Sequence, residues 1–258
     1  MTRVLSGAAM AGVAVALVWF LTPVALLVVA LVVAALAFVE YARIVNAIGA
    51  TVPWWTSLAA TLGACAMVPF PWVSVEVVIV VGLIGMAANV LASDRVGPPT
   101  LADTAAAVLA PVYIGLPLGA LVAIAALAGR EAVLVLMGTV AASDTAQYYT
   151  GRLFGRHPLA PLRSPKKTIE GALGGFVVAP AVLVAAGSAW LPGLTPWRLA
   201  VLGVLIVTAG IIGDLFESML KRAAGMKDSG HLIPGHGGVL DRIDALLFAA
   251  PVFYFFVR

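Results

Sequence analysis

The sequence predicts an all-α membrane protein, a polytopic transmembrane helix bundle of about nine spans, and two observations carry this prediction. Hydrophobic residues make up 62% of the 258 residues and charged residues only 10%, whereas soluble domains carry about 25% charged residues. The apolar residues also form long unbroken runs, and a helix needs about 20 of them to cross a bilayer. A β-barrel would show short alternating segments instead.

Each predicted span begins or ends at a recognisable boundary. Proline stands at or near the start of four spans, where its missing N–H costs nothing, and the six tryptophans fall near span ends, as at a membrane interface. Pro111 and Pro117 interrupt the fifth span, which is therefore either kinked or split in two. The predicted spans are residues 4–21, 23–39, 54–70, 73–92, 101–128, 131–150, 169–190, 197–220 and 239–257.

The first apolar run follows a single arginine, as a signal peptide does. Thr22-Pro23 leads directly into another apolar run, so we expect an uncleaved first helix. Cys65 is the single cysteine, which excludes a disulfide within the chain and predicts a buried thiol. We expect one membrane domain over residues 1–258, with N-terminal spans in 1–130 and catalytic spans in 131–258.

The basic residues are distributed unevenly between the two predicted sides of the membrane. With nine spans and the N-terminus inside, 12 of the 15 Lys and Arg residues fall on one side, and Arg130, Arg198 and Arg258 on the other. The positive-inside rule makes the richer side cytoplasmic. The hydrophilic loops 151–168 and 221–238 lie there, so we expect a multi-pass protein of the inner (cytoplasmic) membrane with a cytoplasmic active site. Nucleic-acid binding is not expected, because no basic stripe with interleaved aromatics is present.

Carboxylates gather at the same predicted membrane face. Asp144 lies near the end of the sixth span, Asp214 and Glu217 lie near the end of the eighth, and Asp241 and Asp244 open the ninth. A carboxylate at membrane depth costs about 2.5–3.5 kcal/mol, so it persists when paired, metal-bound or facing water. Helical spacing places each of the two close pairs on one helix face.

These carboxylates lie beside basic residues, and this combination indicates a hard divalent cation with a phosphate ligand. Lys221 is on the face of Asp214, and a short loop joins the eighth and ninth spans, so their acidic faces can converge. Mg²⁺ prefers one or two carboxylates together with phosphate oxygens and water. A thiolate zinc site is excluded, because these segments contain no cysteine.

Two loops are suited to binding phosphates. Gly237 and Gly238 precede the ninth span, where glycine allows backbone N–H groups to approach a phosphate and the helix end adds positive charge. Lys166 and Lys167, within residues 164–168, can neutralise a triphosphate. The chain has no G-x-x-x-x-G-K-[ST] string, so this is not a P-loop site.

Each feature also has a simpler explanation. The basic clusters could anchor the chain to anionic lipid heads, and Asp144 could be an interhelical hydrogen-bond partner. His157 could be an ordinary loop histidine, Asp241 and Arg242 a charge pair that opens a helix, and the glycines turn residues. A single polyphosphate–metal site accounts for all of these features together, and on one membrane face.

Residues 218–244, SMLKRAAGMKDSGHLIPGHGGVLDRID, resemble the signature of the phosphatidate cytidylyltransferase (CDP-diacylglycerol synthase) family. That signature reads S-x-hydrophobic-K-R, four residues, K-D-x-small, two residues, hydrophobic-P-x-H-G-G-hydrophobic-x-D-R-hydrophobic-D, and every fixed position is matched. SDTAQYY at 143–149 and SPKKTIEG at 164–171 are also similar to family segments, in the expected order. The resemblance covers 143–257 closely and the N-terminal spans only in character.

The resemblance implies a reaction of CTP with phosphatidic acid that gives CDP-diacylglycerol and diphosphate with the help of Mg²⁺. It also implies that Asp214 and Asp241 hold a metal pair, which in at least one member includes K⁺. The oligomeric state, including a homodimer, stays open. The catalytic candidates are Asp144, Lys166, Lys167, Glu217, Lys221, Arg222, Lys227, Asp228, His236, Arg242 and Asp244, and the nucleotide-binding candidates are Lys166, Lys167, Gly237 and Gly238.

Three alternative functions fit the sequence less well. A CTP-dependent lipid alcohol kinase would transfer the γ-phosphate, but the full string at 218–244 argues against it. A CDP-alcohol phosphotransferase would carry D-G-x-x-A-R, which is not found. A transporter would place its charges near the bilayer midplane, often within inverted repeats, whereas here they gather at one face and no repeat is visible.

Overall fold

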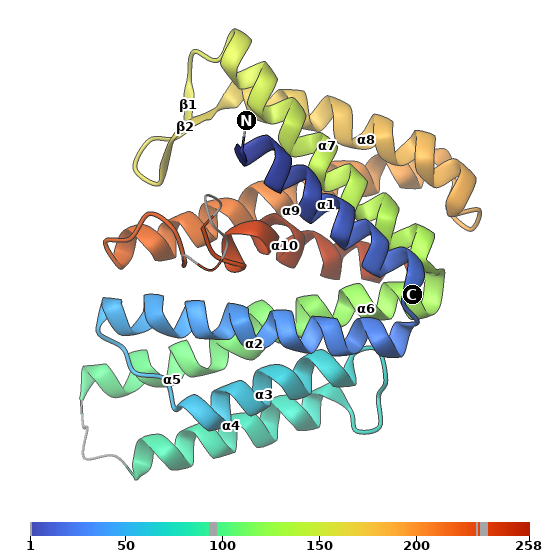
Figure 1. Cartoon of the computed structure of the whole chain (residues 1–258). Helices are drawn as coiled ribbons and strands as arrows, with labels where there is room; N and C mark the ends of the chain where they lie inside the picture. Colours follow the sequence, from blue (N-terminus) through green and yellow to red (C-terminus); the bar gives the residue numbers. More distant parts are fainter. Residues whose placement is uncertain (1, 93–96, 231, 233–236) are drawn as a thin grey trace. The chain divides into compact units, whose positions relative to one another are not determined.

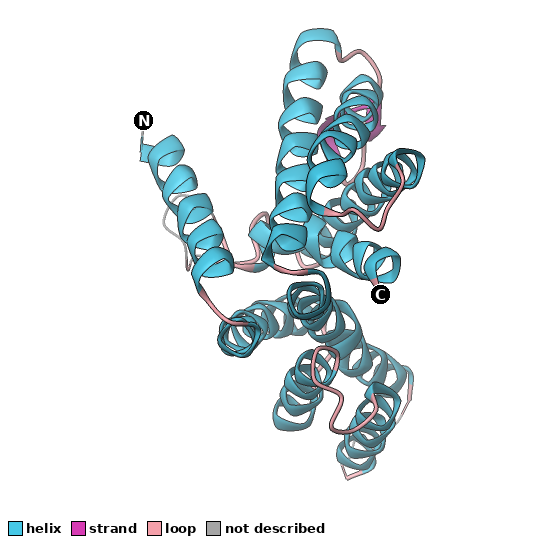
Figure 2. Ribbon diagram, turned by 90° about the vertical axis from the view of Figure 1, so that its right-hand side faces the viewer, coloured by secondary structure: helices cyan, strands magenta, loops and turns pink. Residues whose placement is uncertain are grey.

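The structure, a computed structural model, describes residues 2–92, 97–230, 232 and 237–258 (Figure 1). Helices dominate these residues (Figure 2), which confirms the predicted all-α fold. The elements in chain order are α1 (Thr2–Phe20), α2 (Pro23–Ile48), α3 (Trp54–Met67), α4 (Val75–Leu91), α5 (Pro98–Ala110), η1 (Pro111–Gly115), α6 (Leu116–Ala128), α7 (Arg130–Phe154), β1 (Pro158–Ala160), β2 (Ser164–Thr168), α8 (Ile169–Trp190), α9 (Pro196–Ala223) and α10 (Leu240–Val257).

Local sequence explains where several helices begin and end. Helix α2 begins at Pro23, and the hydroxyl of its N-cap Thr22 accepts a hydrogen bond from Ala25 N at 3.3 Å. It ends at Gly49, whose φ of 97° lies in the left-handed region that glycine tolerates. Helix α9 also begins at a proline, Pro196, so the predicted proline starts are confirmed for these two helices.

The observed helices match the predicted spans in position, with two informative differences. Helix α2 continues to Ile48, beyond the expected end at residue 39, because Glu40 is buried and does not mark a membrane boundary. The span expected at 101–128 is a continuous helical path through a π-helical turn, η1, which begins at Pro111. Proline lacks the N–H of a regular α-helix, and a π turn accommodates this locally.

Among the residues that the structure describes, four helical segments are long and apolar enough to cross a membrane. They cover residues 23–48, 99–128, 169–190 and 196–223. Together with the apolar composition, they identify a membrane-type helical protein. The expected number of nine spans stays a prediction.

The chain divides into two compact units, and the first comprises residues 1–123 and 220–242. Its core includes Phe38 and Tyr41 of α2, both fully buried, and the Tyr41 hydroxyl donates to Ala106 O at 2.8 Å. Cys65 is also buried, as predicted. A side chain at Gly115 would collide with the backbone of α3, so small residues allow these helices to approach closely.

The second unit comprises residues 124–219 and 243–258, and its helices α7 and α8 pack along each other. Side chains at Gly171, Gly174 and Gly175 would collide with residues of α7, which is the small-residue packing expected between membrane helices. The β1–β2 hairpin connects these two helices (Figure 1). The predicted loop 151–168 is therefore partly ordered, because its first residues extend α7 and the rest form this hairpin.

Candidate functional site

In the second unit, a lysine and two carboxylates come together from three elements. Lys167 of β2 forms an ion pair with Asp214 of α9, with 2.6 Å between Nζ and Oδ2. Asp144 of α7 interacts electrostatically with both of these residues, and its Oδ1 accepts a hydrogen bond from Gln147 at 3.3 Å. The structure thus brings together three of the predicted site residues, and all three are ionisable.

The hairpin determines which of the two predicted lysines reaches this cluster. Successive residues of a strand point to opposite faces, so Lys166 and Lys167 of β2 diverge. Lys167 is partly buried against Asp214, whereas Lys166 is exposed. Thr168, at the end of the strand, caps α8 by accepting from Gly171 N at 3.1 Å, which fixes where the strand stops.

Glu170 holds the hairpin at the start of α8. Its Oε2 accepts hydrogen bonds from Arg156 N at 3.0 Å and His157 N at 3.3 Å, and its Oε1 lies 2.7 Å from His157 Nδ1. The side chain of His157 is 72% exposed, which fits the simpler sequence interpretation of an ordinary loop histidine. Glu170 therefore orders the loop that carries Lys167.

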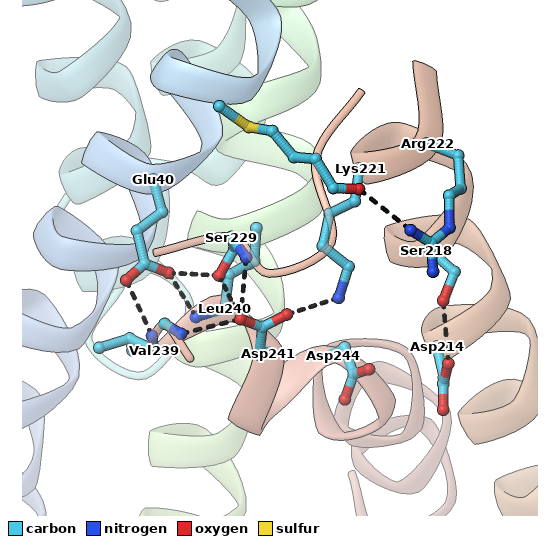
Figure 3. Close-up of polar contacts among 12 residues, drawn as sticks. Glu40, Asp214, Ser218, Lys221, Arg222, Ser229, Val239, Leu240, Asp241 and Asp244 are labelled. Carbon is cyan, nitrogen blue, oxygen red and sulfur yellow. Dashed lines mark hydrogen bonds and ion pairs between the residues drawn. The ribbon is translucent and has the colours of Figure 1, made fainter. Parts of the chain in front are cut away.

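In the first unit, Asp241 at the start of α10 is the centre of a second cluster (Figure 3). Its Oδ2 accepts hydrogen bonds from Ser229 N at 2.9 Å and Gly238 N at 2.8 Å. It also lies 2.9 Å from Ser229 Oγ, whose single hydroxyl hydrogen it shares with Glu40. Its Oδ1 forms an ion pair with Lys221 Nζ, and the side chains are only 6% and 12% exposed. One oxygen of Asp241 is thus held by the protein, and the other faces a lysine.

Glu40 joins the same cluster, and the sequence interpretation missed it. It accepts hydrogen bonds from Ser229 Oγ at 2.8 Å, Val239 N at 2.9 Å and Leu240 N at 2.8 Å. It is 3% exposed and lies within an apolar helix. Its presence in that helix was a usable indication, because a charged residue at membrane depth needs a partner.

Three glycines near the start of α10 in space, Gly230, Gly237 and Gly238, lie against carboxylates. Side chains at Gly230 and Gly238 would collide with Glu40, and one at Gly237 would collide with Asp241. Gly237 also has a positive φ of 82°. These glycines allow the backbone to approach two carboxylates, and phosphate binding by Gly237 and Gly238 stays a prediction.

The remaining predicted site residues differ in burial and in their hydrogen-bond partners. Glu217 is buried, at 1% exposure. Arg222 is exposed and donates to Met226 O at 3.3 Å, near the end of α9, and Asp244 Oδ1 accepts from Ala245 N at 2.7 Å. His236 lies outside the residues that the structure describes. Lys227, Asp228 and Arg242 are exposed.

The donor chemistry at Asp214 and Asp241 fits a hard cation. Among the described residues, no group of three or more His, Cys, Asp and Glu side chains is arranged to hold a metal ion. Mg²⁺ does not need such a group, since it takes one or two carboxylates together with phosphate oxygens and water. Asp214 and Asp241 belong to different units, so a metal site shared between them stays a prediction.

Comparison with known proteins places the chain among cytidylyltransferases. A family model described as "Cytidylyltransferase family" matches residues 1–258. The chain is 49% identical over 118 residues to a phosphatidate cytidylyltransferase of Synechocystis, which is 45% of this chain and 39% of that relative. It is 46% identical over 122 residues to one of Mycobacterium tuberculosis, covering 47% and 37%. An uncharacterized Escherichia coli protein, YnbB, is 43% identical over 130 residues, covering 50% and 43%. The matched part thus spans less than half the length of these relatives.

Proposed function

We propose that this chain, which belongs to the cytidylyltransferase family, makes CDP-diacylglycerol and diphosphate from CTP and phosphatidic acid. The string at 218–244 and the names of the Synechocystis and Mycobacterium relatives support this substrate pair. The observation that carries the proposal is the pair of lysine–aspartate contacts, Lys167 with Asp214 and Lys221 with Asp241. Each pair places an ammonium group, which can bind phosphate oxygens, beside a carboxylate, which can bind a metal ion.

In the proposed reaction, a phosphate oxygen of phosphatidic acid attacks the α-phosphorus of CTP. A bond forms between that oxygen and the α-phosphorus, and the bond from the α-phosphorus to the bridging oxygen of the diphosphate breaks. The lipid phosphate is already an anion near neutral pH, so the reaction needs no strong general base. Catalysis then depends on holding the two phosphates in line and neutralising their charge.

The chain's own residues would divide this work. Lys167 and Lys221 would neutralise phosphate oxygens, and both side chains are already positioned by an aspartate. Asp214 and Asp241 would hold Mg²⁺, with K⁺ as a second ion, and the bound cations would supply further charge neutralisation at the phosphates. Four further basic residues are exposed, namely Lys166, Arg222, Lys227 and Arg242. Their positive charge would attract the anionic substrates to the predicted cytoplasmic face.

The enzyme would act at the cytoplasmic face of the inner membrane. The 12-to-3 distribution of basic residues supports this orientation. CTP would then arrive from the cytoplasm and the lipid laterally from the inner leaflet. Cysteines placed at the exposed positions Leu162 and Leu232, on a Cys65→Ser background, should react with a membrane-impermeant reagent only from the cytoplasmic side. Labelling of either from the outer side would refute the orientation.

An assay with CTP labelled at different phosphates tests the activity. With purified protein, phosphatidic acid and CTP labelled at the α-phosphate, label should appear in the lipid product, with release of unlabelled diphosphate. A lipid alcohol kinase would instead transfer label from the γ-phosphate to a polyprenol and leave CDP. Transfer of γ-label, or no α-label in lipid, would contradict the proposal.

A further inference from the structure

Glu40 is a buried acidic residue in the middle of an apolar helix. It is 3% exposed, and its neighbours Phe38 and Tyr41 on α2 are fully buried. Burying a carboxylate is strongly unfavourable unless hydrogen bonds or a cation compensate its charge. The groups that bind Glu40 therefore explain why it is tolerated there.

Among the described residues, the groups that donate hydrogen bonds to Glu40 are Ser229 Oγ, Val239 N and Leu240 N. Helix α10 begins at Leu240, so Val239 N and Leu240 N belong to the helix end, where N–H groups have no partner within the helix. A local Ser, Thr, Asp or Asn side chain usually caps such an end. Here a residue of α2, far away in the sequence, supplies the cap.

Ser229 also contacts Asp241. Ser229 N and Gly238 N donate to Asp241 Oδ2, and the Ser229 hydroxyl contacts both Glu40 and Asp241 (Figure 3). These groups occupy Oδ2, while Oδ1 faces Lys221. The positions of Ser229 and Gly238 therefore determine which oxygen of Asp241 faces Lys221.

We propose that Glu40 is a positioning residue for Asp241. By capping α10 and holding Ser229, it keeps Asp241 Oδ2 bound to the protein and leaves Oδ1 to face Lys221 and a cation. The inference rests on the proposed function in one respect, namely that Asp241 is a metal ligand. It goes beyond that function by assigning the arrangement of this ligand to a residue outside the 218–244 string.

A purely structural cap would behave differently from a positioning residue. Loss of a structural cap would lower stability and leave the affinity for a metal ion unchanged. Loss of a positioning residue would weaken metal binding, and would do so only while Asp241 is present. Metal affinity measured without substrates therefore separates the two roles.

The test uses the full-length protein in detergent with the variant Glu40→Gln, which keeps the size of the side chain but removes its charge and one acceptor oxygen. Glu76→Gln, an exposed position on α4 of the same unit, is the matched control. Hydrogen exchange measured by mass spectrometry should become faster in the peptides that contain Ser229 and Leu240. The affinity for Mn²⁺ alone, measured by electron paramagnetic resonance without CTP or lipid, should fall at least about tenfold. Neither quantity should change in the control.

A double-mutant cycle with Asp241→Asn completes the test. If Glu40 acts through Asp241, adding Glu40→Gln to Asp241→Asn should weaken Mn²⁺ binding no further. If Glu40→Gln does not fold, Ser229→Ala removes only the shared hydroxyl and should still weaken Mn²⁺ binding at least about threefold. Unchanged exchange or unchanged Mn²⁺ affinity in the folded variant would overturn the inference.

The outcomes also separate this inference from the proposed function. If Asp241→Asn weakens Mn²⁺ binding and Glu40→Gln does not, only the role of Glu40 is overturned. If Asp241→Asn leaves Mn²⁺ binding unchanged, the metal assignment fails and the inference fails with it. Transfer of the cytidylyl group is measured separately with labelled CTP.

Discussion

The two lysine–aspartate pairs differ in how firmly the protein holds them. Asp241 and Lys221 are 6% and 12% exposed, and Ser229 and Gly238 also hold Asp241 by hydrogen bonds. Asp214 and Lys167 are 34% and 23% exposed, and Asp214 accepts a longer hydrogen bond, from Ser218 at 3.4 Å. One pair is thus buried, and the other is partly exposed.

This difference has consequences for chemistry and for stability. A buried pair in a region of low dielectric is pre-organised, so it can act on developing charge without rearrangement. An exposed pair exchanges more easily with solvent and substrate, and contributes little to stability. We therefore expect both pairs to matter for turnover, but only the Asp241 pair to matter for folding.

The largest expected effect is on turnover. Asp214→Asn and Asp241→Asn should each lower kcat at least about a hundredfold, because the amide keeps the shape of the side chain but loses the charge that binds a cation. Both variants should still insert into the membrane. Activity is measured at saturating Mg²⁺ with Glu131→Gln as a control. Near-wild-type turnover in either aspartate variant would remove that residue from the metal assignment.

The second prediction sharpens the comparison by measuring stability. Asp241→Asn breaks a buried pair, which typically costs about 3–5 kcal/mol, whereas Asp214→Asn breaks a partly exposed pair worth about 0–1 kcal/mol. The melting temperature of the purified protein should therefore fall clearly for Asp241→Asn and hardly for Asp214→Asn. Equal shifts for the two variants would show that burial does not distinguish the pairs.

The fold could be predicted from the sequence because hydropathy and helix boundaries are local properties. Pro23 and Pro196 begin helices as expected. The predicted span 23–39 is shorter than α2, which continues past Glu40 to Ile48. Whether Glu40 lies at a boundary depends on donors about 200 positions later in the chain, and no local pattern contains that information.

The candidate site was also predicted only in part. Asp144, Lys167 and Asp214 were predicted together, and the structure brings them together. The sequence could not distinguish Lys166 from Lys167, because the difference arises from a strand within a segment predicted as a loop. The glycines before α10 correctly predicted that the backbone approaches another group closely. The sequence did not show that this group is a carboxylate, Asp241 at Gly237 and Glu40 at Gly238.

The third prediction uses this strand alternation. Lys167→Arg should lower activity at least about tenfold, roughly 1.4 kcal/mol of transition-state stabilisation, because a planar guanidinium places its donors differently from an ammonium. Lys166→Arg, on the exposed face of β2, should have a smaller effect, within about threefold. Both substitutions keep the charge, so orientation in the membrane should not change. Full activity of Lys167→Arg would indicate that the hairpin serves only as a basic anchor.

The smallest expected effect concerns the order of the hairpin that carries Lys167. Glu170 accepts hydrogen bonds from Arg156 N and His157 N and contacts the imidazole of His157. Glu170→Gln removes the charge but keeps one acceptor oxygen, and the imidazole is 72% exposed, so the stability of the protein should hardly change. We expect kcat to fall about two- to threefold through a less ordered Lys167. The control is Glu131→Gln, since Glu131 forms an exposed pair with Arg130 at 3.2 Å at the other end of α7, remote from the hairpin along that helix. If the two variants show the same kcat, the position of Lys167 depends on β2 and on Thr168, the N-cap residue of α8, and not on Glu170.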